Sequence, residues 1–565
     1  MKLSNNKKRK IGELLEQAKA AIAAGRIPAF NELCRRIDAL QPRHPDVANL
    51  KAIAHYKMGR PAEAEQLFIM AINAMPTRPE FHQNLGALYL DTKDYAQAAQ
   101  CYGQAIKLGN KALPVQLCYS KALVETGRLE EAITVLQRLR KQQPRNVDVL
   151  MGLHYAYSPL NRIEEGRACL ETILEQQPGH PEALFELGVM DNQAGRFEQG
   201  EARLRASLAG RPDNPKAYAA LAQVKKFGAD DDADLIAMTD IHNSSAIDSE
   251  DRMGLSYMLG KAMEDLKHYD RAFAYFEEGN ALHHRKSRYN AKEALADMRR
   301  IMEAYTPEVF SHASGMDDAT PVFIIGMPRC GSTLTEQILA AHPDVVSRGE
   351  CDFFESRALA SLHSDGNPLN PEHLATLTPI QWKEIAGIYL EHLKGDDAAA
   401  LRITDKTLTN IRMVGAIHCA LPNAKIVHVR RHPLDTCLSI YKHYLRSRKF
   451  DYGDDLNDLG GYYEMYLKLM QHWRDVLPNG VMYELDYENL IADQEKETRK
   501  LLEYCGLTWD ESCLQFNKTK NTVRTASMAQ VRRGIYTDSQ AAWKRYKKQL
   551  KPLIRILGKG YPKIR

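Results

Sequence analysis

The sequence has little of what marks a secreted, membrane-spanning or nucleic-acid-binding protein. Its 565 residues include 10 cysteines without a Cys-x-x-Cys pair, which excludes the common zinc and disulfide spacings and predicts reduced thiols. No apolar run approaches the about 20 residues that cross a bilayer, and the basic N-terminus lacks the apolar segment of a secretory signal. Lys and Arg total 76 against 72 acidic residues, a balance that does not favour nucleic acid as a partner. We therefore expect a cytoplasmic protein without a membrane span.

An internal repeat fills the first part of the chain. Proline can open a helix at a position where the N–H needs no partner, glycine can end one with a left-handed cap, and a small residue lets a second helix approach closely. Such residues recur every 34 positions, in four series: Pro45, Pro79, Pro181 and Pro215; Gly25, Gly59, Gly127 and Gly195; Ala64, Ala98, Ala132, Gly166 and Gly200; and Pro42, Pro76, Pro144, Pro178 and Pro212. Lys93 and Asn161 fill the gaps in the glycine series. This register predicts stacked helix-turn-helix units.

Residues 11–225 resemble the tetratricopeptide repeat family. A further position on the first helix of each repeat holds a small residue: Ala52, Gly86, Ser120, Gly188 and Ala222. Only His154 departs from this series. The resemblance implies a surface that binds a peptide or protein segment. The alternative is an array that only scaffolds the second half or joins copies into a homo-oligomer.

Residues 226–315 are expected to form a divergent helical repeat and linker. The period is broken after residue 225, but 251–282 again suggests a helix pair, with Tyr269, Ala272 and Phe273 at repeat-like positions. The predicted domains are thus an array over 1–225, this linker, and a third domain over 316–565.

From Pro321 onward, short β-branched runs alternate with helical stretches. That alternation predicts a parallel sheet with helices on its faces, and ligands of such sheets lie at the carboxyl ends of the strands. The expected fold class is therefore α + α/β, in which an all-α tetratricopeptide solenoid precedes a P-loop-like α/β domain.

The stretch PVFIIGMPRCGSTLTEQIL, 321–339, predicts a phosphate cradle. Gly326 and Gly331 have the spacing of the loop G-x-x-x-x-G-K-[ST], but Ser332 stands where the lysine belongs. Glycines let the backbone wrap an anion, and the positive end of the following helix points at it. The candidate binding residues are Arg329, Cys330, Gly331, Ser332 and Thr333. The missing lysine argues against a Mg²⁺-dependent nucleotide hydrolase or a kinase-like enzyme using Mg²⁺ and ATP; a tight turn without a ligand is the alternative.

A second anion site is predicted where the run KIVHV ends. Arg431 and, eight residues on, Ser439 could converge on one phosphate, although an exposed basic strand end would look the same. Together, PRCGSTL and RHPLDTCLS resemble the sulfotransferases, which bind 3′-phosphoadenosine 5′-phosphosulfate (PAPS) in a kinase-like fold. The resemblance implies that the first motif holds the phosphosulfate end and that Arg431 and Ser439 hold the 3′-phosphate. Arg430 is kept as the alternative to Arg431.

The same resemblance assigns the remaining candidates. Tyr487, or alternatively Tyr483, would contact the adenine side, and Arg532 and Arg533 would return to the 3′-phosphate. Trp543 and His342 are expected to be structural.

For catalysis, the resemblance implies Glu350 as the base and Lys406 and Arg329 as the cations that stabilise the leaving phosphate. The alternatives are a helix-capping role for Glu350 and a surface position for Lys406. In DKTLTN, 405–410, Leu408 replaces a proline that relatives often have, which makes the loop geometry less certain. No metal is expected, because these cations and backbone N–H groups can neutralise the leaving group.

The predicted function is sulfuryl transfer from PAPS to a hydroxyl acceptor. The domain also resembles tyrosylprotein sulfotransferase, so a tyrosine in a peptide or protein held by the repeats is the first acceptor to consider. A glycan, a lipid or a small metabolite stays open, as does a scaffold protein with an inactive nucleotide-binding domain.

Overall fold

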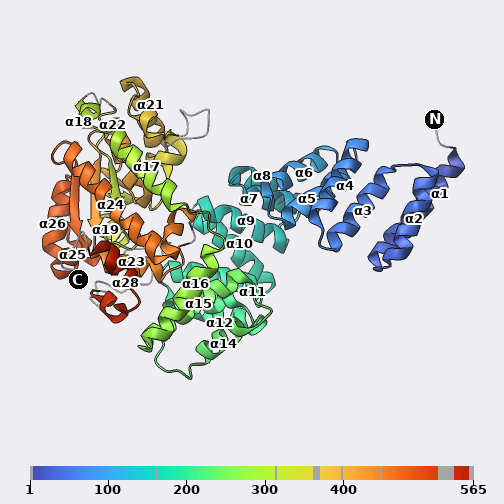
Figure 1. Cartoon of the computed structure of the whole chain (residues 1–565), viewed down its shortest axis with the longest axis horizontal. Helices are drawn as coiled ribbons and strands as arrows, with labels where there is room; N and C mark the ends of the chain where they lie inside the picture. Colours follow the sequence, from blue (N-terminus) through green and yellow to red (C-terminus); the bar gives the residue numbers. More distant parts are fainter. Residues whose placement is uncertain are drawn as a thin grey trace. The chain divides into compact units, whose positions relative to one another are not determined.

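The computed structural model describes residues 4–160, 162–311, 315–359, 370–395, 397, 399–445, 447–518 and 540–558. The chain divides into two compact units, Met1–Leu187 and Gly188–Arg565. Figure 1 shows helices throughout both units and the sheet in the second. Each unit is described on its own.

Antiparallel helix pairs build the first unit. The first helices of the pairs are α1 (Asn5–Ala23), α3 (Pro45–Lys57), α5 (Pro79–Asp91), α7 (Leu113–Glu125), α9 (Val147–Tyr157) and α11 (Pro181–Gln193), the last of which continues into the second unit. Their partners are α2 (Ile27–Leu40), α4 (Pro61–Ala74), α6 (Tyr95–Lys107), α8 (Leu129–Gln142) and α10 (Ile163–Gln176). From α3 onward the first helices begin on the predicted proline register, so the repeat prediction is confirmed.

The turns inside the pairs carry the predicted left-handed residues. Gly25, Gly59 and Gly127 have φ of 67°, 73° and 75°. Lys93 adopts the same conformation, with φ 62°, although its Cβ makes that region unfavourable. Asn161 lies outside the described residues. The α5–α6 pair therefore carries backbone strain that the pairs with Gly25, Gly59 and Gly127 avoid.

Lys93→Gly should stabilise the third pair. Removing the Cβ relieves the left-handed strain, and after the extra flexibility of glycine in the unfolded chain we expect a gain of about 0.5–1 kcal/mol. Hydrogen exchange of the amides in α5 and α6 measures this local free energy. Lys121→Gly, inside α7, is the matched control and should cost about 1 kcal/mol. Faster exchange in Lys93→Gly would contradict the strain argument.

The exception at His154 is compensated across the helix pair. Ala64, Ala98 and Ala132 are completely buried where the second helix meets the first. At the matching position α10 has Gly166, where a Cβ would lie 3.2 Å from His154 Nδ1. A large residue on one helix is thus accommodated by the smallest residue on the other.

The second unit begins with further pairs. Its helices are α12 (Phe197–Gly210), α13 (Pro215–Val224), α14 (Ala233–Asn243), α15 (Ser249–Asp265), α16 (Tyr269–His284), α17 (Ala291–Ala304) and α18 (Pro307–Ser311). The 251–282 helix pair is present as α15 and α16, whose turn contains Lys267 at φ 64°. Ala272 is completely buried, as its repeat-like position implies. The boundaries at residues 225 and 315 stay predictions.

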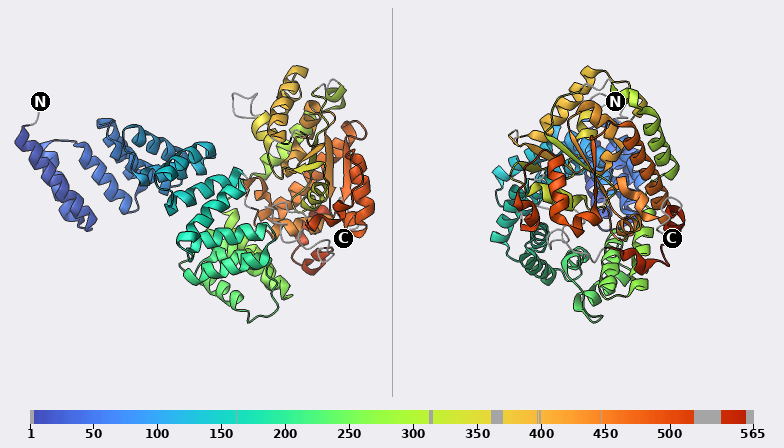
Figure 2. Two further views of the ribbon diagram at one scale, coloured as in Figure 1. Left: turned by 180° about the vertical axis from the view of Figure 1, so that it is seen from behind. Right: turned by 90° about the vertical axis from the view of Figure 1, so that its left-hand side faces the viewer.

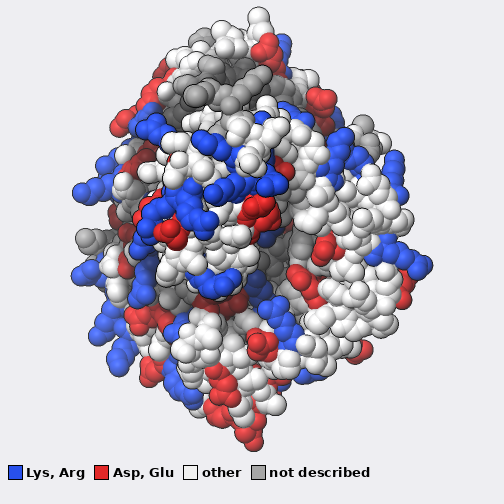
Figure 3. Space-filling model, turned by 90° about the vertical axis from the view of Figure 1, so that its right-hand side faces the viewer, with Lys and Arg blue, Asp and Glu red and all other residues white. Residues whose placement is uncertain are grey.

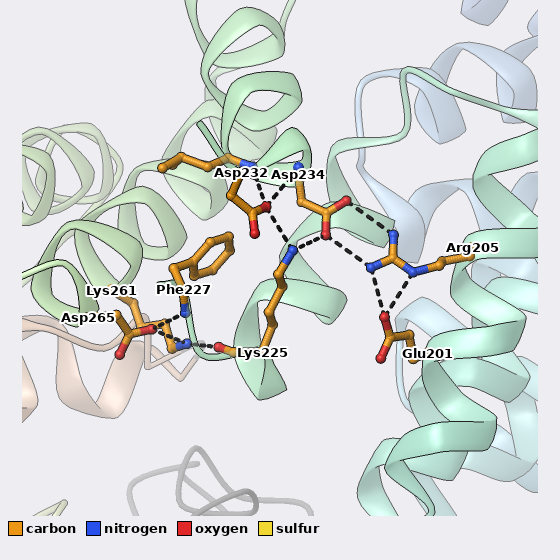
Figure 4. A network of polar contacts seen from close by, with 9 residues as sticks. Glu201, Arg205, Lys225, Phe227, Asp232, Asp234, Lys261 and Asp265 are labelled. Atoms are coloured by element: carbon orange, nitrogen blue, oxygen red, sulfur yellow. Dashed lines mark hydrogen bonds and ion pairs between the residues drawn. The ribbon is translucent and has the colours of Figure 1, made fainter. Parts of the chain in front are cut away.

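A polar network holds the segment that breaks the period (Figure 4). Asp234 accepts hydrogen bonds from Arg205 at 3.2 Å and from Lys225 at 2.6 Å. The Phe227 N–H donates to Asp265 at 3.2 Å. Burial raises the pKa of the Asp234 carboxyl, but the two cations outweigh it and lower that pKa overall. The network therefore joins α12, the linker, α14 and α15.

The sheet has five strands in the order β2-β3-β1-β4-β5, and every pairing is parallel. The strands are β1 (Pro321–Ile325), β2 (Val345–Ser347), β3 (Arg402–Asp405), β4 (Lys425–Arg430) and β5 (Met482–Asp486). The predicted parallel sheet is confirmed. The three-residue edge strand β2 was not predicted, because so short a run carries no periodic signal.

Helices cover both faces of the sheet (Figure 2). The main ones are α19 (Ser332–Ala340), α20 (Pro371–Leu374), α21 (Pro379–Lys394), α22 (Val414–Ala420), α23 (Pro433–Tyr441), α24 (Leu456–Val476), α25 (Tyr487–Ala492), α26 (Gln494–Tyr504) and α28 (Lys551–Leu557). Short stretches of tighter or wider helix also occur: η1 (Ser158–Leu160) in the first unit, and η2 (Phe354–Leu359), η4 (Leu408–Arg412), η5 (Arg448–Asp454), η6 (Glu511–Lys518) and η7 (Ala542–Tyr546) in the second.

Strand β1 is buried on both sides. Phe323 and Ile325 belong to the core with α21 and α24, while Val322 and Ile324 belong to the core with α19, α25 and α26. Successive side chains of a strand point to opposite faces, so this one strand anchors both layers and positions the loop that follows it.

The helices before the sheet share its core. Phe273 of α16 stacks on Tyr441 of α23 with ring centroids 5.4 Å apart. Asn280 Nδ2 donates to the Tyr441 carbonyl at 2.9 Å. Tyr305 packs edge-on against Trp473 of α24 at 5.6 Å. The helical segment and the α/β part therefore pack as one body within the second unit.

Two surface observations bear on partners. None of the described helices combines the length and the hydropathy that crossing a membrane requires. On the face drawn in Figure 3, Lys and Arg are interspersed with Asp and Glu, in line with the near-zero balance of the sequence.

Candidate active site

The described candidate residues lie in segments that follow the carboxyl ends of the strands. In a parallel sheet these ends share one edge, which is where ligands bind. The segments are 326–333 after β1, 348–350 after β2, 406 after β3, 431–439 after β4 and 487 after β5. Arg532 and Arg533 lie outside the described residues.

The loop after β1 requires its two glycines. Gly326 has φ 149°, and a Cβ there would lie 2.6 Å from the Val429 carbonyl oxygen. Gly331 has φ 108°, and a Cβ there would lie 2.5 Å from Tyr487. Gly331 is also the N-cap of α19, so Ser332 and Thr333 belong to the first helical turn. The N–H groups of that turn have no hydrogen-bond acceptors inside the helix. The loop is built as an anion cradle should be.

Burial keeps the Cys330 side chain inside this cradle. It is 2% exposed, and burial raises the pKa of its thiol to about 11. Cys330 therefore stays a neutral thiol at neutral pH, and an anion in the loop would meet backbone N–H groups rather than a thiolate.

Arg329 is held by groups on α23 and the residues after it. Its Nε donates to Ser439 Oγ at 3.1 Å, and its Nη2 lies 3.5 Å from His443 Nε2. His443 Nδ1 donates to the Ser439 carbonyl at 2.6 Å. Burial, and then the neighbouring Arg329 cation, lower the pKa of His443 well below its usual range, so the ring is neutral and can accept. Sequence reasoning overlooked His443, because nothing in the local pattern marks it.

Arg431 lies beside this group. Its Nη1 donates to the Arg329 carbonyl at 3.1 Å, and its guanidinium is 4.9 Å from the ring centroid of Tyr487. Arg430, the alternative, is engaged by Glu484 at 2.7 Å and Asp486 at 2.9 Å on the β5 side. Tyr483 stacks on Tyr504 at 5.1 Å. These contacts favour Arg431 and Tyr487 over Arg430 and Tyr483.

Lys406 and Glu350 form a close pair. Lys406 Nζ lies 2.6 Å from Glu350 Oε1; the lysine side chain is 1% exposed and the glutamate 48%. Burial alone lowers the pKa of Lys406, but the carboxylates of Glu336 and Glu350 outweigh it and raise that pKa overall. The site therefore contains a buried ammonium beside a carboxylate that solvent can reach.

Two buried carboxyls near this pair were missed in the sequence. Glu336 is 4% exposed on α19, and Asp405, just before Lys406, is completely buried. Asp405 accepts hydrogen bonds from the Tyr389 hydroxyl at 3.0 Å and the Thr407 N–H at 2.9 Å. Burial raises the pKa of Asp405. The polar pattern of α19 could not single out Glu336. Every residue of Ser332–Leu339 is buried, so the helix has no exposed face with which to contrast it.

Two residues expected to be structural have structural contacts. His342 Nε2 donates to the Thr508 carbonyl at 3.0 Å. The Trp543 ring stacks on His432 at 5.7 Å, and its N–H donates to Asp435 at 3.0 Å. The C-terminal segment thus reaches the start of α23.

Among the described residues, one group has the side chains and spacing of a possible metal site. It consists of His283 on α16 with Asp451 and Asp454 of η5. His283 Nδ1 lies 2.7 Å from Asp454 Oδ2, and this hydrogen bond raises the pKa of the histidine. His283 is far from the two aspartates in the chain, so sequence spacing could not reveal the group.

Comparison with known proteins gives the following matches. A sequence model of the sulfotransferase family matches residues 321–511. An uncharacterized protein of Aquifex aeolicus is 35% identical over 332 residues, 57% of this chain and 43% of that one. A protein-tyrosine sulfotransferase of Drosophila melanogaster is 24% identical over 258 residues, 43% of this chain and 49% of that one. The chain thus spans less than half the length of these relatives.

The repeats match independently. Tetratricopeptide repeat models match residues 49–112, 89–153, 127–190 and 160–224. A tetratricopeptide repeat protein of Parabacteroides merdae is similar in structure, with 16% identity and a TM-score of 0.35, over 44% of this chain and 94% of that one. The chain therefore combines N-terminal tetratricopeptide repeats with a C-terminal domain of the sulfotransferase family.

Proposed function

We propose that the C-terminal domain transfers a sulfuryl group from PAPS to a hydroxyl acceptor. The observation that carries the proposal is the edge of the sheet, where the glycine loop with Arg329 and Arg431 meets the Lys406–Glu350 pair. A nucleotide with a phosphate at each end accounts for cations that follow three successive strands of the sheet: Lys406 after β3, Arg329 after β1 and Arg431 after β4. The match to the sulfotransferase family supports the same reaction.

The reaction needs charge stabilisation, a base and alignment. By analogy with phosphoryl transfer the transition state is loose, with charge on the leaving and transferred oxygens. Lys406 and Arg329 would stabilise that charge, and the N–H groups at the start of α19 would hold the same end of the donor. Glu350 would take the acceptor proton late, when the hydroxyl has become acidic.

The acceptor we favour is a tyrosine of a peptide or protein segment bound with help from the repeats. The similarity to a protein-tyrosine sulfotransferase and the presence of tetratricopeptide repeats support this choice. Glycan, lipid and metabolite hydroxyls are the alternatives. Assay of each acceptor class with labelled donor distinguishes them.

Calorimetry with 3′-phosphoadenosine 5′-phosphate, compared with Mg²⁺-ATP, tests the donor site. We expect preference for the 3′-phosphorylated nucleotide and a loss of about 10- to 100-fold in Arg431→Ala, the value of hydrogen bonds to a charged group. Arg430→Ala is the matched control, because Arg430 is paired with Glu484 and Asp486. Preference for Mg²⁺-ATP, or equal losses in both variants, would contradict the assignment; no binding of either nucleotide would favour a scaffold role.

A further inference from the structure

Glu336 connects three segments from inside the domain. It accepts hydrogen bonds from Ser347 Oγ at 2.9 Å, the Gly349 N–H at 3.0 Å and Thr404 Oγ1 at 3.3 Å. Its own helix, α19, begins at the glycine loop. One buried carboxylate thus joins the phosphate loop, the end of β2 and the end of β3.

The turn that presents Glu350 is fixed by hydrogen bonds on both sides of one residue, Gly349. The Gly349 N–H donates to Glu336, and the Gly349 carbonyl accepts from the Lys406 N–H at 2.8 Å. Gly349 has φ 66°, a conformation that favours glycine. Glu350 follows directly, so the bond to Glu336 determines where that side chain starts.

Glu336 also acts electrostatically on the buried ammonium. Burial raises the pKa of Glu336, and Lys406 opposes that rise. The groups that act electrostatically on Lys406 are Glu336 on α19, Glu350 after β2 and the Cys330 thiol in the phosphate loop. Glu350 is half exposed, where an acceptor would approach, whereas Glu336 is enclosed. Glu336 is therefore a second carboxyl group acting on Lys406, and unlike Glu350 it is closed off from solvent.

We propose that Glu336 is a positioning residue for sulfuryl transfer, which holds the Gly349–Glu350 turn and provides an enclosed carboxyl group that acts on Lys406. The proposal rests on the proposed function of the site. Glu336 acts through its neighbours, since Glu350 and Lys406 are the groups assigned to the reacting atoms.

Removal of the Glu336 charge should alter the pH profile. Burial lowers the pKa of Lys406, and the charge of Glu336 is the first-ranked single cause that raises it, followed by the charge and the hydrogen bond of Glu350. Without that carboxylate, Lys406 loses its proton at a lower pH, and activity should begin to fall at a lower pH than in the wild type. A purely structural role would change stability and leave this limb where it is.

The test measures release of 3′-phosphoadenosine 5′-phosphate from PAPS with a tyrosine-containing peptide as acceptor. Glu336→Gln should lower kcat by about 10- to 100-fold, the usual effect of a supporting residue behind a site, with the donor KM nearly unchanged. The high-pH side of its activity profile, where activity falls as Lys406 loses its proton, should shift to lower pH. Glu336→Asp keeps the charge but not the reach, so its kcat should fall while its basic limb stays near the wild-type position. Glu497→Gln is the control, because Glu497 is also buried and bonded to a lysine, Lys500, at 2.7 Å.

The outcomes separate the two proposals. If the wild type transfers sulfuryl and Glu336→Gln keeps the wild-type kcat and pH limb, the role of Glu336 is wrong and the function stands. If Glu336→Gln loses donor binding and thermal stability together, without a shifted limb, Glu336 is only structural. If the wild type neither binds nor uses the donor, both proposals fail.

Discussion

Glu350→Gln is expected to lower kcat by about 10²- to 10⁴-fold, the contribution of a positioned general base. Glutamine keeps the size of the side chain and can still accept the hydrogen bond from Lys406 Nζ, now 2.6 Å from Glu350 Oε1. It cannot take a proton from the acceptor hydroxyl. Because Glu350 is 48% exposed, its replacement should leave folding unchanged.

The measurement is kcat with PAPS, beside calorimetry with 3′-phosphoadenosine 5′-phosphate. Nucleotide affinity should stay within a few-fold of the wild type, since the phosphate-binding groups are on other segments. Glu355→Gln is the control; Glu355 lies one turn further on and pairs with Lys449 at 3.3 Å. Wild-type kcat in Glu350→Gln would leave the Lys406 contact as the function of Glu350 and require another base.

Lys406→Met should lower kcat by about 10²- to 10³-fold, the usual effect of removing one group that stabilises charge in the transition state. Methionine fills the space of the lysine stem, and the side chain is only 1% exposed. The change also leaves Glu336 without its cation. Losing the ammonium that offsets the burial of Glu336 leaves that carboxyl less well compensated, so the variant should unfold at a lower temperature.

A double variant separates the two effects of that change. In Lys406→Met with Glu336→Gln, neither charge remains, and thermal stability should recover while kcat stays low. Lys394→Met is the control for loss of a part-buried lysine. Lys394, at the end of α21, pairs with Asp318 at 2.6 Å. Recovery of kcat in the double variant would show that Lys406 serves the fold and not the reaction.

The repeat register and the parallel sheet could be predicted because each has a period. Proline, glycine and alanine repeat with the helices of the array, and β-branched runs mark the central strands. The 34-residue register also reaches Ser249, the first residue of α15. No proline marks that position, so this pair could be predicted only from Tyr269, Ala272 and Phe273. Strand β2 was too short for any period to appear.

The candidate residues that belong to a sequence motif could be predicted. Those brought together only by packing could not. Gly326, Gly331 and Arg431 stand in recognisable stretches. Glu336 and His443 act through neighbours that are distant in the chain: Glu336 through Thr404, and His443 through Arg329. Such contacts depend on how strands are ordered in the sheet, which no local pattern states.

The contact of α16 with α23 limits how this protein could have been assembled by gene fusion. Asn280 is bonded to the Tyr441 carbonyl, two residues beyond Ser439, and Phe273 covers the same tyrosine ring. A recombination that joined foreign repeats directly before β1 would strip this side of α23 and expose its apolar surface. A fusion that keeps these contacts must therefore transfer α15 and α16 together with the sulfotransferase domain. This last helix pair belongs structurally to that domain.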